Sequence, residues 1–130
     1  MGVYNGSSAS PGSTVIQRSF EQFAASRNYP TEPTPFTGRS DYGPFLTLRD
    51  GFPAGGLFSG AEVIKNKAQR AAYGGMQNVA FDPCYHQACD TVENINVQGL
   101  DMMSQMAAYS VSHFGFISNL RPILSKGANR

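Results

Sequence analysis

Two segments of the chain carry mainly apolar residues at spacings of three and four, which places their side chains on one face of an α-helix. The first segment begins at Ser13, and its inward face comprises Val15, Ile16, Ser19, Phe20, Phe23 and Ala24. Polar and charged residues fill the positions between them. We predict an amphipathic helix with Ser13 as its N-cap and an end near Asn28.

The second segment runs from about Gln98 to Phe114. Its apolar stripe is Val97, Leu100, Met103, Met106 or Ala107, Val111 and Phe114. Methionines on such a stripe are more typical of core packing than of a cofactor site. The stripe predicts a long helix that lies on a sheet, because burying each large apolar side chain contributes roughly 1.5–3 kcal/mol. His113 is expected to be an ordinary residue of this helix.

Between these helices the pattern changes from element to element. Residues 1–5 favour an extended strand, and the three prolines of residues 29–36 favour an extended crossing. Ser40 and Asp41 predict the cap of a short helix that stops by Gly51. Residues 65–75 predict a brief exposed helix.

The segment FPAGGLFSG at residues 52–60 is apolar and rich in glycine. This composition predicts a strand buried on both faces, as in parallel or mixed sheets covered by helices. The fold class is therefore α/β. Only two or three strands can be found, so the rest of the sheet lies in a partner chain or in polypeptide absent from this sequence, and we favour absence.

Composition narrows the classes of function. The chain has 130 residues, 41% hydrophobic content and a formal net charge of +1 without a basic run, so we expect neither nucleic acid nor a membrane surface as a partner. It lacks the run of roughly 18–20 apolar residues needed to span a membrane. Its first residues also lack the pattern of a signal peptide, and we expect a soluble chain.

Both cysteines lie in the stretch DPCYHQACDT, five positions apart at Cys84 and Cys89. A disulfide is sterically reasonable at this spacing, and it would indicate a secreted protein. The alternative is a pair of metal ligands, which is less favoured because no second pair accompanies it. An Asn-Gly-Ser sequon makes Asn5 a candidate glycosylation site, which also fits secretion.

Three motifs occur in the order GRSDYGPF, GFPAGGLFSGAE and AFDPCYHQACDT. Together they resemble the C-terminal part of the secreted co-catalytic zinc aminopeptidases, a group that includes fungal aminopeptidase Y and bacterial leucine aminopeptidases. The resemblance covers about residues 1–114. It implies a partial three-layer α/β/α fold with a mixed sheet, from which the N-terminal half of the domain is missing. Residues 1–115 would belong to the catalytic domain, and residues 116–130 would form a mixed, frayed tail.

The resemblance also implies roles for four residues. His86 matches the last histidine ligand of two zinc ions, and Tyr85 matches a donor to the developing oxyanion. Arg39 and Phe58 match residues that receive the substrate. The ordinary alternatives remain open: a structural histidine, a tyrosine packed on the cystine, a surface arginine and a core phenylalanine.

Two acidic residues of the same motifs receive lesser roles. Asp90 is expected to be an acceptor that stabilises the loop. Glu62 receives a structural role only, because the family's general base lies in an upstream Glu-Glu pair.

The family's H-x-D element, its Glu-Glu pair and its further aspartate find no counterpart here. The resemblance therefore implies a fragment of a metallo-aminopeptidase that removes N-terminal residues from peptides with a free N-terminus, inactive as this chain alone. The alternatives are a non-catalytic interaction module and a glutaminyl cyclase-like acyltransferase. The sequence leaves the oligomeric state open.

Overall fold

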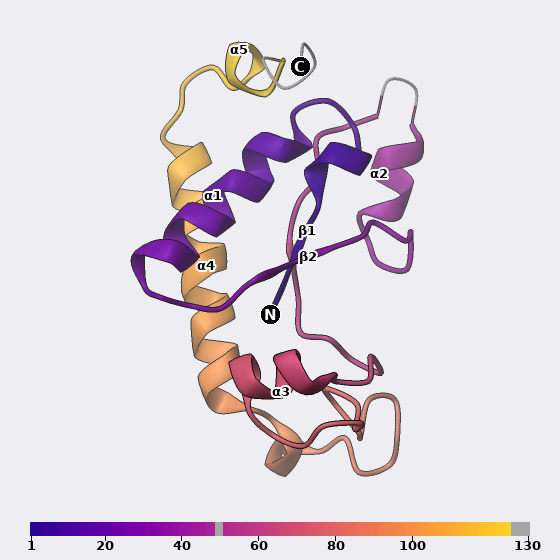
Figure 1. Cartoon of the computed structure of the whole chain (residues 1–130). Coiled ribbons are helices and arrows are strands. Elements are labelled where there is room, and N and C mark those ends of the chain that lie inside the picture. The colour runs from indigo at the N-terminus through magenta and orange to yellow at the C-terminus, as the bar shows by residue number, and fades with distance from the viewer. Residues whose placement is uncertain (49–50, 126–130) are drawn as a thin grey trace.

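The computed structural model describes residues 1–48 and 51–125 (Figure 1). Its centre is a three-stranded mixed sheet in the order β2-β1-β3. The strands are β1 (Gly2–Tyr4), β2 (Glu32–Thr34) and β3 (Leu57–Phe58). β1 runs parallel to β2 and antiparallel to β3, and Gly2 is paired with both Glu32 and Phe58. The α/β class and the mixed sheet are thus confirmed.

Two long helices, α1 (Ser13–Ser26) and α4 (Val97–Gly115), form the main apolar layer. They lie side by side, and α1 also contacts β1 (Figure 1). The core between them contains Met1, Val3, Phe20, Ala24 and Met106. The side chain of Met106 is fully buried, so its predicted packing role is confirmed. A hydrogen bond of 2.9 Å between the hydroxyls of Ser19 and Ser110 joins the two helices inside this core.

The start of α1 differs from the prediction in one respect. Gly12 is the N-cap, with a φ of +90° in the left-handed region, and Ser13 is the first helical residue. The Ser13 hydroxyl is instead buried and accepts a hydrogen bond of 3.0 Å from the amide of Ala54. Ser13 therefore fastens the helix to the segment before β3 rather than capping its own first turn.

The shorter elements connect these layers. They are the 3-10 helices η1 (Gly6–Ser8) and η2 (Val92–Asn94), and the α-helices α2 (Gly43–Thr47), α3 (Lys67–Tyr73) and α5 (Arg121–Leu124). Asn66 and Gln69 form a capping box at the start of α3. The short helices predicted near residues 41–51 and 65–75 are present. The predicted cap at Ser40 and Asp41 is wrong, because the N-cap of α2 is Tyr42 and no side chain caps the helix. α5 lies within residues 116–130, the tail that was expected to fray, and residues 126–130 of that tail lie outside the described residues.

The strand predicted for residues 52–60 is wrong in length and burial. Only Leu57–Phe58 pair as a strand, and both residues are half-buried. Leu57 contacts the helical core, whereas Phe58 lies on the opposite face with Tyr4, since residues paired across a sheet share a face. Within the described residues this second face carries aromatic side chains instead of a second layer of long helices.

Large apolar side chains remain exposed on several elements. They include Val97 and Val111 of α4, and Phe116 just after it, with 71%, 74% and 91% of their surface exposed. No helix among the described residues is long and apolar enough to cross a membrane.

Candidate functional site

A cavity of about 310 Å³ opens on the aromatic face of the sheet. Its walls include Arg39, Phe58 and Tyr85, which come from three separate segments of the chain. These are three of the four residues that the resemblance assigns to substrate binding and catalysis. The fold therefore brings them to one place.

Phe58 is held in the wall by its neighbours on the sheet. Its ring centroid lies 6.4 Å from that of Tyr4. Tyr4 in turn packs against Phe36 and Tyr42, with ring centroids 4.8 and 4.9 Å away. Burial raises the pKa of Tyr4 to about 12, so its hydroxyl is neutral at physiological pH. This aromatic cluster gives the cavity an apolar wall.

Arg39 lies on an exposed loop whose shape depends on Tyr42. The amides of Thr37 and Gly38 donate hydrogen bonds of 3.0 and 3.1 Å to the Tyr42 hydroxyl. Burial opposes ionisation of that hydroxyl, but these donated hydrogen bonds favour it more strongly, and the pKa of Tyr42 is lowered. Gly38 has a φ of +78°, a backbone conformation that is unfavourable for a residue with a side chain.

Glu62 is the partner of Arg39 at the edge of the cavity. Its carboxylate lies 2.7 Å from the Arg39 guanidinium. The hydrogen bond to Glu62 raises the pKa of Arg39, while Glu62's own backbone amide, and then Arg39, lower the pKa of Glu62. Only a structural role was predicted for Glu62 from the sequence, without a part in the site. One available signal was that Glu62 is the first charged residue after eleven uncharged ones, residues 51–61.

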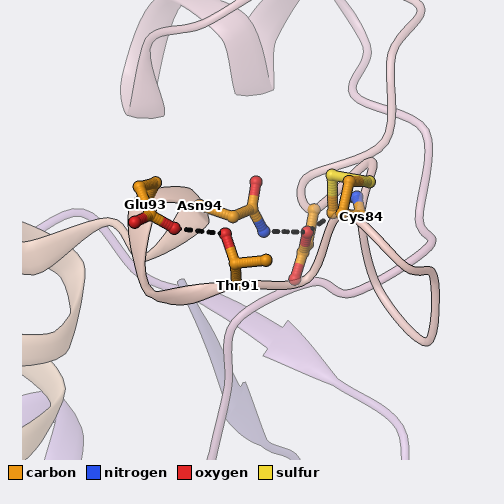
Figure 2. Close-up of a disulfide and its surroundings, with 6 residues drawn as sticks. Cys84, Thr91, Glu93 and Asn94 are labelled. Atoms are coloured by element: carbon orange, nitrogen blue, oxygen red, sulfur yellow. Dashed lines mark hydrogen bonds between the residues drawn. A yellow bond between two sulfur atoms is a disulfide. The ribbon is translucent and has the colours of Figure 1, made fainter.

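The loop that carries Tyr85 is closed by a disulfide between Cys84 and Cys89, whose Cα atoms lie 5.3 Å apart (Figure 2). The predicted disulfide is thus present in the structure. Inside the ring, the amide of Gln87 donates a hydrogen bond of 2.8 Å to the Cys84 carbonyl.

A second set of contacts fixes the loop from outside the ring. Asp82 Oδ1 accepts hydrogen bonds from the Cys84 amide at 3.0 Å and from Asn94 Nδ2 at 2.9 Å. The Thr91 hydroxyl donates to Glu93 at 2.6 Å and lowers the pKa of that carboxyl (Figure 2). The acceptor that stabilises the loop is therefore Asp82, and among the described residues no side-chain hydrogen bond of Asp90 is formed.

Tyr85 and His86 stack face to face, with ring centroids 3.9 Å apart and planes inclined by 18°. Tyr85 is half-buried and lines the cavity, whereas His86 is exposed and lies outside its lining. His86 has a φ of +57°, in the left-handed region that few residues with side chains occupy. The backbone thus turns sharply at the histidine.

The described residues do not form a metal centre by themselves. Across residues 1–48 and 51–125, no three histidine, cysteine, aspartate or glutamate side chains gather closely enough to hold a metal ion. The cysteines are joined to each other, so neither offers a thiolate. His86 contributes one imidazole, and a zinc site needs three or four protein ligands.

Two other predicted residues lie apart from the cavity. Asn5 is the N-cap of η1, where its side chain accepts hydrogen bonds from the Ser7 amide at 3.1 Å and the Ser7 hydroxyl at 2.7 Å. His113 is exposed on α4 and stacks on Tyr109, with ring centroids 5.8 Å apart. Its interpretation as an ordinary helix residue agrees with this position.

Comparison with known proteins relates the chain to peptidases. Leucine aminopeptidase 2 from Trichophyton equinum is 45% identical over 103 residues, which is 79% of this chain and 20% of the relative. Leupeptin-inactivating enzyme 1 from Streptomyces exfoliatus is 44% identical over 102 residues, or 78% of this chain and 23% of the relative. Probable leucine aminopeptidase 2 from Aspergillus fumigatus is 42% identical over 103 residues, again 79% and 20%.

The chain thus spans about a fifth of the length of these curated relatives. A sequence model of peptidase family M28 matches residues 3–111, a range that contains most of the cavity lining and the disulfide loop. Because this match covers most of the chain, the protein belongs to peptidase family M28.

Proposed function

We propose that this chain is the substrate-binding part of a metallo-aminopeptidase that removes N-terminal residues from peptides. The observation that carries the proposal is that Arg39, Phe58 and Tyr85 line one cavity although they are far apart in the sequence. The names of the relatives, leucine aminopeptidase 2 among them, support the substrate class.

Each of the three residues has a chemical role in this proposal. Phe58 and the aromatic cluster behind it offer an apolar surface for the first side chain of the substrate. Tyr85 donates a hydrogen bond to the oxyanion that develops when the peptide carbonyl is attacked, and one such donor is typically worth a factor of about 10²–10³ in rate. Arg39 adds a fixed positive charge beside it, because its pKa is raised above an already high value.

Metal binding requires more than this chain provides. In the proposal His86 is one histidine ligand of a centre of two zinc ions, and the remaining ligands come from polypeptide outside these 130 residues. Zinc bound there would supply Lewis-acid chemistry to the complete enzyme. The described residues do not fit a complete zinc site, so we assign this chain no metal-dependent step and expect it to be inactive alone.

Secretion and glycosylation belong to the same proposal. A disulfide persists in oxidising compartments, so the Cys84–Cys89 bond supports an extracellular protein. Glycosylation of Asn5 stays a prediction.

A second candidate is a non-catalytic interaction module of the same fold. It is favoured by exposed apolar side chains such as Val111 and Phe116, at 74% and 91% exposure, which need a covering surface. In the first proposal the rest of the enzyme covers them, and in the second a separate protein does.

A chimera tests the first proposal. Residues 3–111 of this chain, the range of the family match, replace the matching segment of leucine aminopeptidase 2 from Trichophyton rubrum, a relative 43% identical over 103 residues. Zinc content and cleavage of a leucyl anilide are measured on the chimera and on the unaltered relative.

We expect an active chimera whose kcat falls about 10²–10³-fold when Tyr85 is replaced by phenylalanine. The 130-residue chain alone should bind less than one zinc ion and cleave nothing. A folded, zinc-loaded chimera without activity, or one indifferent to Tyr85→Phe, would contradict the proposal.

A further inference from the structure

We propose that Glu62 is a positioning residue that holds the Arg39 guanidinium beside Tyr85 at the cavity. The inference rests on the proposed function and deepens it, since it explains how the substrate-binding arginine is kept in place. Two observations support it, the exposure of Arg39 and the constrained backbone on either side of Glu62. A general rule adds to them, because an exposed ion pair of this kind contributes little to stability.

Arg39 needs an external support because its side chain is 71% exposed. It extends from a loop that follows Gly38, next to which there is open space. A free arginine at such a site samples many rotamers. Within the described residues, the 2.7 Å contact with Glu62 is the only ion pair that restrains it.

Glu62, by contrast, sits on a constrained backbone. The two residues before it have positive φ angles, +110° at Gly60 and +41° at Ala61, and Ala61 is buried. The carbonyl of Ala61 accepts a 2.9 Å hydrogen bond from the amide of Asp82. The carbonyl of Val63 accepts another, also of 2.9 Å, from Phe81.

This attachment links Glu62 to the loop that carries Tyr85. Asp82, which is bonded to the backbone beside Glu62, also accepts the amide of Cys84 at the start of the disulfide ring. Glu62 and Tyr85 are therefore fixed to the same backbone frame, whereas Arg39 comes from a different loop. The ion pair is the contact that brings Arg39 into register with Tyr85.

Stability does not explain the pair. Ion pairs between solvent-exposed side chains contribute little to folding, because water screens the charges and two long side chains must be ordered. The pair lies on the wall of the candidate site, and the backbone beside Glu62 is constrained. Its role is therefore to order the Arg39 side chain at that site.

The expected effect is modest and measurable. Ordering one rotamer-rich side chain in advance of binding corresponds to roughly 2- to 12-fold in affinity or in kcat/KM. Loss of Glu62 should therefore lower kcat/KM by that factor. The loss should disappear when Arg39 is already absent.

The first arm of the test uses the 130-residue chain. Nuclear magnetic resonance follows the side-chain Nε–H group of Arg39 in the wild type, in Glu62→Gln and in the control Glu21→Gln. The control removes a similar charge from α1, where Glu21 accepts a 2.7 Å hydrogen bond from Gln17. We expect Glu62→Gln alone to shift and mobilise the Arg39 signal, with the melting temperature changed by less than about 3 °C.

The second arm uses the chimera and measures kcat/KM for Glu62→Gln, Arg39→Ala and the double variant. We expect Glu62→Gln to add less than about 1.5-fold to the loss of kcat/KM caused by Arg39→Ala. If the two residues acted independently, their separate losses would multiply in the double variant. Glu62→Asp, which keeps the charge, should retain more activity than Glu62→Gln. The inference would be overturned if the losses of kcat/KM from the two single variants multiply in the double variant of an active chimera. An Arg39 signal that Glu62→Gln leaves unchanged would also overturn it. An inactive chimera counts against the proposed function, and the resonance arm then decides on Glu62.

Discussion

Replacing Cys84 and Cys89 together by serine tests how much order the disulfide gives to the loop that carries Tyr85. The bond closes a ring across five positions of sequence. In the chain-entropy description, closing so short a ring stabilises the folded state by about 2 kcal/mol. With a typical urea dependence of 1–3 kcal/mol per molar, the unfolding midpoint should fall by roughly 1 M. Circular dichroism at the helical band follows this transition, because α1 and α4 lie in the core.

The local effect should exceed the global one. The amides of Gln87 and Asp90 donate turn hydrogen bonds of 2.8 and 3.0 Å within or beside the ring, and their hydrogen exchange should accelerate in the serine variant. The Cys84 amide should stay partly protected, because Asp82 still accepts it from outside the ring. Resonances of α1 should be unchanged.

Chemical reduction of the wild-type chain is the matched control, since it opens the ring without changing any atom of the backbone. A wild-type unfolding midpoint and a wild-type exchange rate of the Gln87 amide in both forms would refute this prediction. In that case the hydrogen bonds to Asp82, rather than the disulfide, would be the source of order in the loop.

Three further outcomes follow from the structure. The Ser19 hydroxyl donates to the Ile16 carbonyl at 2.8 Å, so Ser110 supplies the proton of the Ser19–Ser110 bond. In urea unfolding, Ser19→Ala should lower the free energy of unfolding by about 1–3 kcal/mol and Ser110→Ala by about 0.5–1.5 kcal/mol. The double variant should lose less than the sum of the two. Burial raises the pKa of Tyr4 to about 12, so the stability that its neutral hydroxyl contributes is complete below pH 10 and is lost as the pH rises toward 12. Solvent exposure limits this loss to about 1 kcal/mol. Unfolding curves at pH 9–11 should show the loss in the wild type and not in Tyr4→Phe. Gly60 has a φ of +110° and its added Cβ would overlap the Phe81 ring, so Gly60→Ala should lower the free energy of unfolding by about 2–5 kcal/mol, and a wild-type midpoint would contradict this account.

The extents of the two long helices could be predicted from the spacing of their apolar residues. The buried face of α4 was predicted less well, because its buried residues are Met106 and Ser110, whereas Val97, Leu100 and Val111 of the predicted stripe are exposed. The stripe that begins at Ser13 is observed as α1 (Ser13–Ser26), and the stripe ending at Phe114 as α4 (Val97–Gly115). The cap of α1 could not be predicted, because Ser13 is a good N-cap in isolation. Its hydroxyl is used by the distant amide of Ala54.

The prediction of a strand at residues 52–60 was wrong for a different reason. Its composition resembles a strand covered on both faces, but glycines also serve where another segment passes close by. A Cβ at Gly55 would overlap Ile16 of α1, so this glycine marks a close crossing rather than a long strand. Composition alone does not separate the two uses of glycine.

The sequence led to Arg39, Phe58 and Tyr85 because their motifs are distinctive, and the structure places all three on one cavity. It missed the residues that support them. Asp82 and Glu62 act through contacts that depend on the folded path of two loops, and no spacing in the sequence encodes such contacts. The isolated charge of Glu62 after residues 51–61 marks that residue in the sequence, but its partner Arg39 becomes visible only in three dimensions.

The separation between the helical layer and the cavity face has an evolutionary consequence. The core residues of the two long helices, such as Met106, are not among the residues that line the cavity. A lineage can therefore alter the cavity loops by many single replacements while its folding reserve stays above the threshold that selection enforces. Diversification of the cavity in this scaffold should therefore alter the loops and spare the interior between the two long helices.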